Sequence, residues 1–172
     1  MNSSGAVYDS APDATFLALA LVWTRDQADL LLGFIWAGYD RMRASMPVID
    51  TRDLERAITQ RLEARINDVM TGDEPFYVQH SPFERETMAP APAQPPANDF
   101  AFVWREEERI MWPVEAKILK TPRSLADYKR GLHDNYLSCR YAPFSSGGAM
   151  LGYLLSGSAA AAGTIRLTYQ PT

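Results

Sequence analysis

The chain has 172 residues, of which 47% are apolar and 22% are charged, with a formal net charge of −4 at pH 7. This composition excludes a disordered or low-complexity chain, and its acidic balance argues against a protein that coats nucleic acid through bulk positive charge. The single cysteine, Cys139, excludes an intramolecular disulfide framework and a zinc site built from cysteines.

The N-terminal part predicts helices that are apolar on nearly all sides. Residues 14–44 have helical composition, and their halves FLALALVW and LLLGFIWAGY predict a segment that is deeply packed or lies in a subunit contact. Gly33 and Gly38 are its weak points, and Pro47 ends it. Charges interrupt the apolar run at residues 25–29, so we expect no membrane span. The first residues lack the basic start of a signal peptide, and we expect a cytoplasmic protein.

A second helix is predicted over residues 50–69, with Asp50 or Thr51 as the N-cap and Gly72 as the C-cap glycine. A short strand, Phe76–His80, and a proline-rich connector over residues 89–98 follow.

The remaining chain predicts a hairpin and then mixed elements. Strands at Phe100–Trp104 and residues 110–119 flank the charged turn REEER, and a helix is predicted over residues 124–137. A glycine-rich turn at residues 145–148, an apolar helix over 149–155 and a last strand over 164–169 complete the order. We therefore expect one mixed α/β domain over residues 1–172, with a helical extension at 1–48 and a core at 50–172.

The hairpin brings acidic residues together. If its turn is centred on Glu107, Asp99 lies opposite Glu115, and the period of two directs Asp99, Glu115 and Lys117 toward one face. Opposed carboxylates repel each other, so positive charge is expected between them, with Lys117 supplying part of it and a divalent cation the rest. The alternative is that Glu115 and Lys117 mark a solvated edge strand, which Pro113 would also favour.

The second helix carries a further carboxylate. On a helical wheel Glu55 falls within the apolar stripe of Leu54, Ile58, Leu62 and Ile66, whereas Glu63 lies at its margin. A carboxylate on a buried face needs a partner or a cation. The alternative is an ordinary first-turn glutamate favoured by the helix dipole.

These residues resemble the PD-(D/E)xK nuclease superfamily, whose fold is restriction-endonuclease-like: a central mixed β-sheet flanked by helices. LERAITQRL is similar to the first core helix of that family, and NDFAF followed by PVEAKIL is similar to its two catalytic strands. Asn98 stands where the motif has proline, a position that is not a ligand. The resemblance covers residues 50–140, and the later helix and strand of the fold extend it toward the end.

The resemblance implies a metal-dependent nuclease that acts on DNA, with RNA as the other possible substrate. Asp99 and Glu115 would hold Mg²⁺, for which Mn²⁺ can substitute, with the Ala116 carbonyl and Glu55 completing the ligands and Glu63 as the fallback for Glu55. Lys117 would orient or help deprotonate the attacking water and stabilise negative charge.

Basic residues follow the proposed site and are candidates for contact with a phosphate backbone: Lys120, Arg123, Lys129 and Arg130. Tyr128, Tyr136 and Tyr141 are candidates for stacking on bases, although the helical spacing of the first two favours core packing. His80 and His133 lack metal-ligand spacing, which argues against a zinc hydrolase.

The acidic net charge suggests that a second copy or a partner protein, bound through the N-terminal helices, supplies part of the DNA affinity. Two other functions fit the same residues. One is a non-catalytic interaction subunit of a larger complex, and the other is a different metal-dependent phosphohydrolase.

Overall fold

The computed structural model describes residues 14–44, 54–84, 95–120, 122–138, 143 and 147–155. Its elements are helices α1 (Ala14–Asp26), α2 (Ala28–Ala44), α3 (Leu54–Val69) and α4 (Pro122–Gly131), a π-helical turn η1 (Leu132–Leu137), and strands β1 (Phe76–His80), β2 (Phe100–Trp104), β3 (Met111–Ile118) and β4 (Ala149–Tyr153). The chain is therefore a mixed α/β fold, as predicted.

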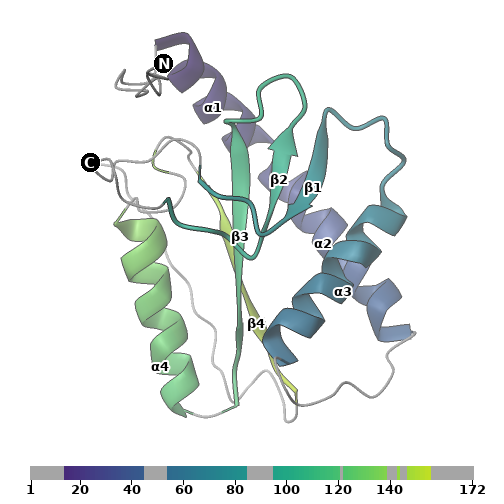
Figure 1. Ribbon diagram of the computed structural model, residues 1–172, viewed down its shortest axis with the longest axis vertical. Coiled ribbons are helices and arrows are strands. Elements are labelled where there is room, and N and C mark those ends of the chain that lie inside the picture. Colours follow the sequence, from purple (N-terminus) through teal and green to yellow (C-terminus); the bar gives the residue numbers. More distant parts are fainter. Residues whose placement is uncertain are drawn as a thin grey trace, which may run out of the picture.

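The strands form one sheet in the order β1–β2–β3–β4 (Figure 1). Strands β1, β2 and β3 are antiparallel neighbours, and β4 runs parallel to β3. Phe100 pairs with Val114 and Phe102 with Trp112, which is the predicted hairpin register. Strand β3 lies between β2 and β4, but β2 pairs with it only as far as Val114, so Glu115 and Lys117 have a strand neighbour on the β4 side alone. These two residues thus lie at a local edge on the β2 side, whereas the expectation of a solvated position is wrong for Glu115, which is buried. Pro113 is tolerated there because the β3–β4 ladder starts only at Val114.

The first helices and α3 share one hydrophobic core with the sheet. Side chains of α1, α2 and α3 pack on Phe76, Phe100, Phe102, Trp112 and Val114. The α1–α2 junction remains hydrogen-bonded, because the Gln27 N–H donates to Trp23 O and the Leu31 N–H donates to Gln27 O. The predicted packing of this segment is confirmed for one stripe, whereas Leu19, Val22, Leu30 and Trp36 remain exposed.

Helix α4 lies on the other side of the sheet from α3 (Figure 1). Tyr128 donates a hydrogen bond from its hydroxyl to Met150 O (2.7 Å), and Tyr136 donates one to Ala149 O (2.8 Å). Both tyrosines therefore fasten this helical segment to β4, and they are half-buried rather than core residues as their helical spacing had favoured. Tyr141, the third candidate for base stacking, lies outside the described residues.

Two predictions near the C-terminal part have different outcomes. The predicted helix over residues 149–155 is wrong, because Ala149–Tyr153 is the parallel strand β4. A short apolar run of this length fits a buried strand as well as a helix, and periodicity alone does not separate them. The predicted strand over residues 164–169 lies outside the described residues, as do Cys139, Pro47, Asp50, Thr51 and most of the proline-rich connector.

Gly72 lies beyond the C-terminal end of α3. Gly72 has a φ of 91°, the left-handed conformation that suits glycine, but it lies three residues after Val69 rather than directly at the helix end. Within the described residues, no helix combines the length and the apolar character needed to cross a bilayer.

Candidate active site

The site lies where β3 extends past the beginning of β2. Strand β2 begins at Phe100, opposite Val114, while β3 continues to Ile118. Two carboxylates take the place of the missing strand. Asp99 Oδ2 accepts the Ala116 N–H (2.7 Å), and Glu55 Oε2 accepts the Ile118 N–H (2.8 Å). The first turn of α3 is thereby fixed against the end of β3.

Lys117 forms ion pairs with Glu55 and Glu115. Its Nζ lies 3.1 Å from Glu55 Oε1 and 3.0 Å from Glu115 Oε1. The Glu115 side chain is only 11% exposed, so this ion pair is shielded from solvent on one side. The structure thus brings together Glu55, Asp99, Glu115 and Lys117, which come from α3, the residue before β2, and β3.

Burial and mutual repulsion set the charge state of the site. Burial raises the pKa values of Asp99 and Glu115 above their ordinary range, and the negative charge of Asp99 raises that of Glu115 further. Burial alone would lower the pKa of Lys117. The attraction of Glu115 and Glu55 outweighs this effect, and the pKa of Lys117 is raised. Lys117 is therefore firmly protonated in this arrangement.

Asp99 is held by its main chain as well as by its side chain. The Ser81 N–H donates to Asp99 O (2.9 Å), and Ser81 itself has a φ of 46°, an uncommon left-handed conformation for serine. The preceding Asn98 is buried, and its N–H donates to Pro82 O (3.0 Å). Asn98 therefore has a backbone role beside the site.

The Ala116 carbonyl is placed by the strand geometry. The N–H and C=O of one residue in a β-strand point to the same side. The Ala116 N–H points to Asp99, so its carbonyl also points to the side of β3 that β2 leaves uncovered. This position is compatible with the predicted role of Ala116 as an additional oxygen ligand.

Glu63, the fallback for Glu55, has a different partner. It lies two turns further along α3, where its Oε2 is 3.6 Å from His80 Nδ1. Burial raises the pKa of Glu63. His80 contributes to the field at Asp99, since its charge lowers the Asp99 pKa. His133 is remote from this pair in the chain and lies 3.1 Å from Asp134.

The four predicted phosphate-contacting residues follow β3 and lie along α4, and their side chains are exposed: Lys120, Arg123, Lys129 and Arg130. Arg130 NH1 lies 3.3 Å from Asp127 Oδ1. The Lys120 N–H donates to Ser124 Oγ (2.9 Å), which connects the end of β3 to the start of α4. The four basic residues thus lie on the segment that follows the end of β3.

The oxygen ligands of the site fit Mg²⁺ in type and number. Across the described part of the chain, no three His, Cys, Asp or Glu side chains gather closely enough to hold a metal ion by themselves. Mg²⁺, however, takes only one or two carboxylates and keeps several waters. Asp99 and Glu115 supply two such carboxylates, and burial, which raises the pKa of both, disfavours their ionised forms. The residues therefore fit a single hard cation.

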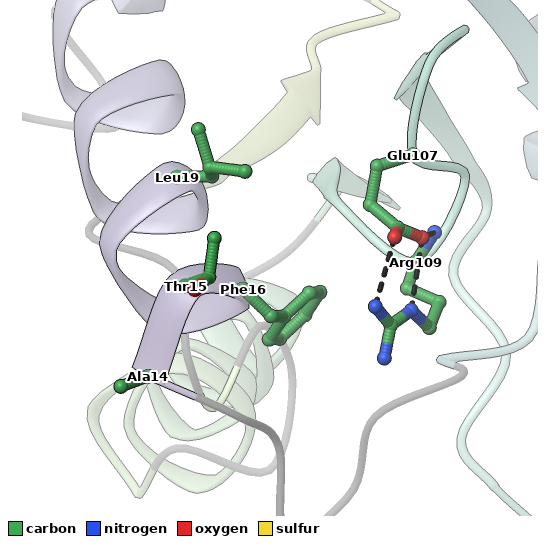
Figure 2. A pocket seen from close by; sticks show the side chains of 6 residues that line it. All are labelled: Ala14, Thr15, Phe16, Leu19, Glu107 and Arg109. Atoms are coloured by element: carbon green, nitrogen blue, oxygen red, sulfur yellow. Dashed lines mark hydrogen bonds and ion pairs between the residues drawn. The ribbon is translucent and has the colours of Figure 1, made fainter.

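A separate pocket lies at the other end of the β2–β3 hairpin (Figure 2). It is lined by Phe16 and its neighbours on α1 and by Glu107 and Arg109 from the turn. Glu107 holds the Arg109 guanidinium through two hydrogen bonds (2.9 and 2.8 Å), and this group lies 4.5 Å from the centre of the Phe16 ring. The charge of Arg109 is thus already compensated, and this pocket is not part of the carboxylate site.

Two residues near the site were missed by sequence reasoning, Thr59 and Tyr153. Their hydroxyl groups lie 3.1 Å apart, next to the main chain of Glu55. Thr59 carried a signal, because it is a polar residue beside the apolar stripe of α3. Tyr153 carried no such signal, since its segment was predicted to be a helix.

In comparisons with known proteins, no protein-family model, curated protein or solved structure matches the chain.

Proposed function

We propose that this chain is a metal-dependent nuclease of restriction-endonuclease-like fold that hydrolyses phosphodiester bonds in DNA. The observation that carries the proposal is that Glu55 and Glu115 both pair with Lys117 at the end of β3, where Asp99 accepts the N–H of the neighbouring Ala116. The element order supports it. Helix α3, the β2–β3 hairpin, α4 and β4 follow one another as the first core helix, catalytic strands, later helix and later strand of the resemblance do.

The charge balance of the site favours a divalent cation. The site holds three carboxylates and one ammonium, which pairs with two of them, and burial disfavours the ionised forms of Asp99 and Glu115. In this proposal Asp99 and Glu115 hold Mg²⁺, with the Ala116 carbonyl as a further ligand and Glu55 contributing directly or through water. Mn²⁺ prefers the same carboxylate, carbonyl and water ligands and can substitute. The bound cation would neutralise a non-bridging phosphate oxygen and produce a hydroxide near neutral pH.

Lys117 has the charge needed to stabilise negative charge on the phosphate as it is attacked. Despite burial, its pKa is raised by Glu115 and Glu55, the carboxylates that the proposal also assigns to the cation, so it is a proton donor in hydrogen bonds here. We assign it the orientation or deprotonation of the attacking water, together with the stabilisation of negative charge. The exposed basic residues on and before α4 would hold the phosphate backbone: Lys120, Arg123, Lys129 and Arg130.

A non-catalytic interaction subunit is the alternative, and one observation favours it. Each carboxylate of the site already has a structural partner, because Asp99 and Glu55 accept β3 amides and Glu115 pairs with Lys117. Such a set would hold the fold together without a metal. This alternative predicts that Mg²⁺ and Mn²⁺ leave the melting temperature unchanged, whereas the nuclease proposal predicts that they raise it.

The decisive experiment is a cleavage assay on supercoiled plasmid, linear DNA, single-stranded DNA and RNA with Mg²⁺, Mn²⁺ or EDTA. We expect metal-dependent cleavage of DNA that Glu115→Gln and Lys117→Ala reduce at least a hundredfold, the order expected for loss of a metal ligand or a charge-stabilising group. Cleavage of small phosphoesters with intact polynucleotides would instead indicate another metal-dependent phosphohydrolase.

Matched controls separate loss of the site from loss of the fold. Arg65→Ala removes a cation of similar exposure from α3, where Arg65 pairs with Asp68 (2.7 Å), and Glu74→Gln removes a carboxylate outside the site. Both controls should cleave like the wild type. Wild-type protein that cleaves none of the substrates, or site variants that cleave as well as these controls, would overturn the proposed function.

A further inference from the structure

A bridge of two hydroxyl groups connects α3 to β4 beside the site. Thr59 is 1% exposed, and its Oγ1 donates to Glu55 O (2.9 Å). The same oxygen lies 3.1 Å from the hydroxyl of Tyr153, the last residue of β4. Thr59 therefore contacts the main chain of Glu55 on one side and β4 on the other.

The donor in the hydrogen bond between the two hydroxyl groups follows from the number of hydroxyl protons. A hydroxyl group has one proton to donate, and that of Thr59 is used on Glu55 O, so Tyr153 donates to Thr59 Oγ1. Burial raises the pKa of Tyr153, and the nearby carboxylates of Asp99 and Glu55 raise it further, which keeps the phenol protonated. The bridge thus runs from Tyr153 through Thr59 to Glu55.

Both ends of Glu55 are then attached to the β3–β4 pair. Its carboxylate binds Lys117 and the Ile118 N–H, while its carbonyl is tied through Thr59 to Tyr153. Ile118 and Tyr153 are direct neighbours in the parallel ladder, and the Leu119 N–H donates to Tyr153 O (2.9 Å). Movement of α3 along the sheet would therefore break the side-chain contacts and the bridge together.

We propose that Thr59 and Tyr153 are positioning residues that fix Glu55 in the site. This inference rests on the proposed function, because it assigns the two hydroxyl groups to the placement of a carboxylate of the proposed metal site. Outer residues of this kind hold ligands in orientation, and their loss typically costs about tenfold to a hundredfold in metal affinity or activity. Neither residue touches the reacting atoms, and neither is assigned a catalytic role.

The test uses Thr59→Val and Tyr153→Phe, which remove one hydroxyl each with little change of shape, and Thr59→Ser, which keeps it. Tyr128→Phe is the matched control, because Tyr128 also fastens a helix to β4 through its hydroxyl but acts on α4. The first measurement is the amide resonance of Ile118 in the full-length protein, since this amide donates to Glu55. It does not require any activity.

We expect Thr59→Val and Tyr153→Phe to shift the Ile118 amide toward its position in Glu55→Ala, and Thr59→Ser and Tyr128→Phe to leave it unchanged. An Ile118 amide that is unaffected by Thr59→Val and Tyr153→Phe would overturn the inference. This result is distinct from failure of the proposed function, which would appear as a wild-type protein without metal-dependent cleavage.

The second measurement is the Mg²⁺ dependence of plasmid cleavage. We expect Thr59→Val and Tyr153→Phe to require about tenfold more Mg²⁺ for half-maximal cleavage, with the double variant no worse than the more affected single variant because both break one bridge. If the wild-type protein cleaves DNA, and Thr59→Val and Tyr153→Phe need no more Mg²⁺ than Tyr128→Phe does, the positioning role is overturned.

Discussion

Glu63 and Glu74 are two carboxylates whose surroundings move their pKa values in opposite directions. Burial raises the pKa of Glu63 on α3. Hydrogen bonds from the Thr71 and Gly72 amides (2.9 and 2.8 Å) lower that of Glu74, which lies just before β1. Substituting each of them therefore tests whether a raised and a lowered pKa change the pH dependence of stability in opposite directions.

The raised pKa of Glu63 means that its stabilising effect is present below the unfolded pKa of about 4.3 and is lost as the pH rises through the folded pKa. The lowered pKa of Glu74 has the opposite consequence: its contribution is present above about 4.3 and is lost as the pH falls through the folded pKa. Relative to wild type, Glu63→Gln should therefore gain stability from acid toward neutral pH, and Glu74→Gln should lose it.

Urea unfolding of the three proteins at several pH values measures these differences. Both variants remove one carboxylate, so each serves as the control for the other. Two difference curves with the same slope would contradict the environments described for these residues. His80 modulates the result for Glu63, because its charge opposes the effect of burial.

For single residues, the candidate site was predictable where a pattern of nearby residues in the chain indicates it. Asp99, Glu115 and Lys117 follow from the alternation of a strand and the register of a hairpin, and the register is confirmed by the pairing of Phe100 with Val114. Glu55 follows from the position of a charge within the apolar stripe of a helix. Thr59 and Tyr153 depend on the contact of α3 with β4, 94 residues apart in the chain, and no local pattern encodes it.

At the scale of elements, the two glycines of α2 have different surroundings although both interrupt the same helix. A Cβ at Gly38 would lie 2.6 Å from Ile66 Cγ1 and 2.9 Å from Ile66 N, so the absence of a side chain permits α2 and α3 to approach closely. A Cβ at Gly33 would meet nothing within 4 Å. Sequence reasoning treated both as weak points, because propensity does not reveal packing.

We predict that Gly38→Ala destabilises the protein by about 1–3 kcal/mol, since the α3 backbone must move to accept the methyl group. Gly33→Ala should stabilise it by about 0.5–1 kcal/mol, because alanine loses less backbone entropy in a helix. Thermal and urea unfolding of both variants check these values. A Gly38→Ala protein as stable as Gly33→Ala would show that the two helices are not in close contact.

Strands were predictable when their partners are near in the chain. The hairpin of β2 and β3 is encoded by two runs of β-forming residues and a short charged turn. Strand β4 instead pairs in parallel with β3 after α4 and η1, so its partner is far away in sequence. Its run AMLGY contains Gly152, at which a Cβ would lie 2.6 Å from Leu119 Cδ1, so the Leu119 side chain would have to move to accept a larger residue.

At the scale of the whole molecule, several large apolar side chains of α1 and α2 are exposed. The inner stripe of these helices belongs to the core, but Val22 is 52% exposed, Leu30 49% and Trp36 65%. Extensive exposed apolar area commonly marks a contact surface. Under the proposed function, two copies would bring two sets of the exposed basic residues on and before α4 to one DNA molecule, whereas the net charge of −4 of each copy does not favour binding.

We therefore predict that the full chain self-associates through the outer side of α1 and α2, and that Trp36→Ser shifts it toward the monomer. Light scattering across a wide range of protein concentrations measures this directly. Phe83→Ser is the matched control, because Phe83 is also an aromatic residue with 50% exposure but lies after β1, away from these helices. The control should associate as the wild type does, since it leaves α1 and α2 intact. A wild-type protein that is monomeric at every concentration and fully active on DNA would contradict the prediction, because the basic residues of one copy would then suffice for binding.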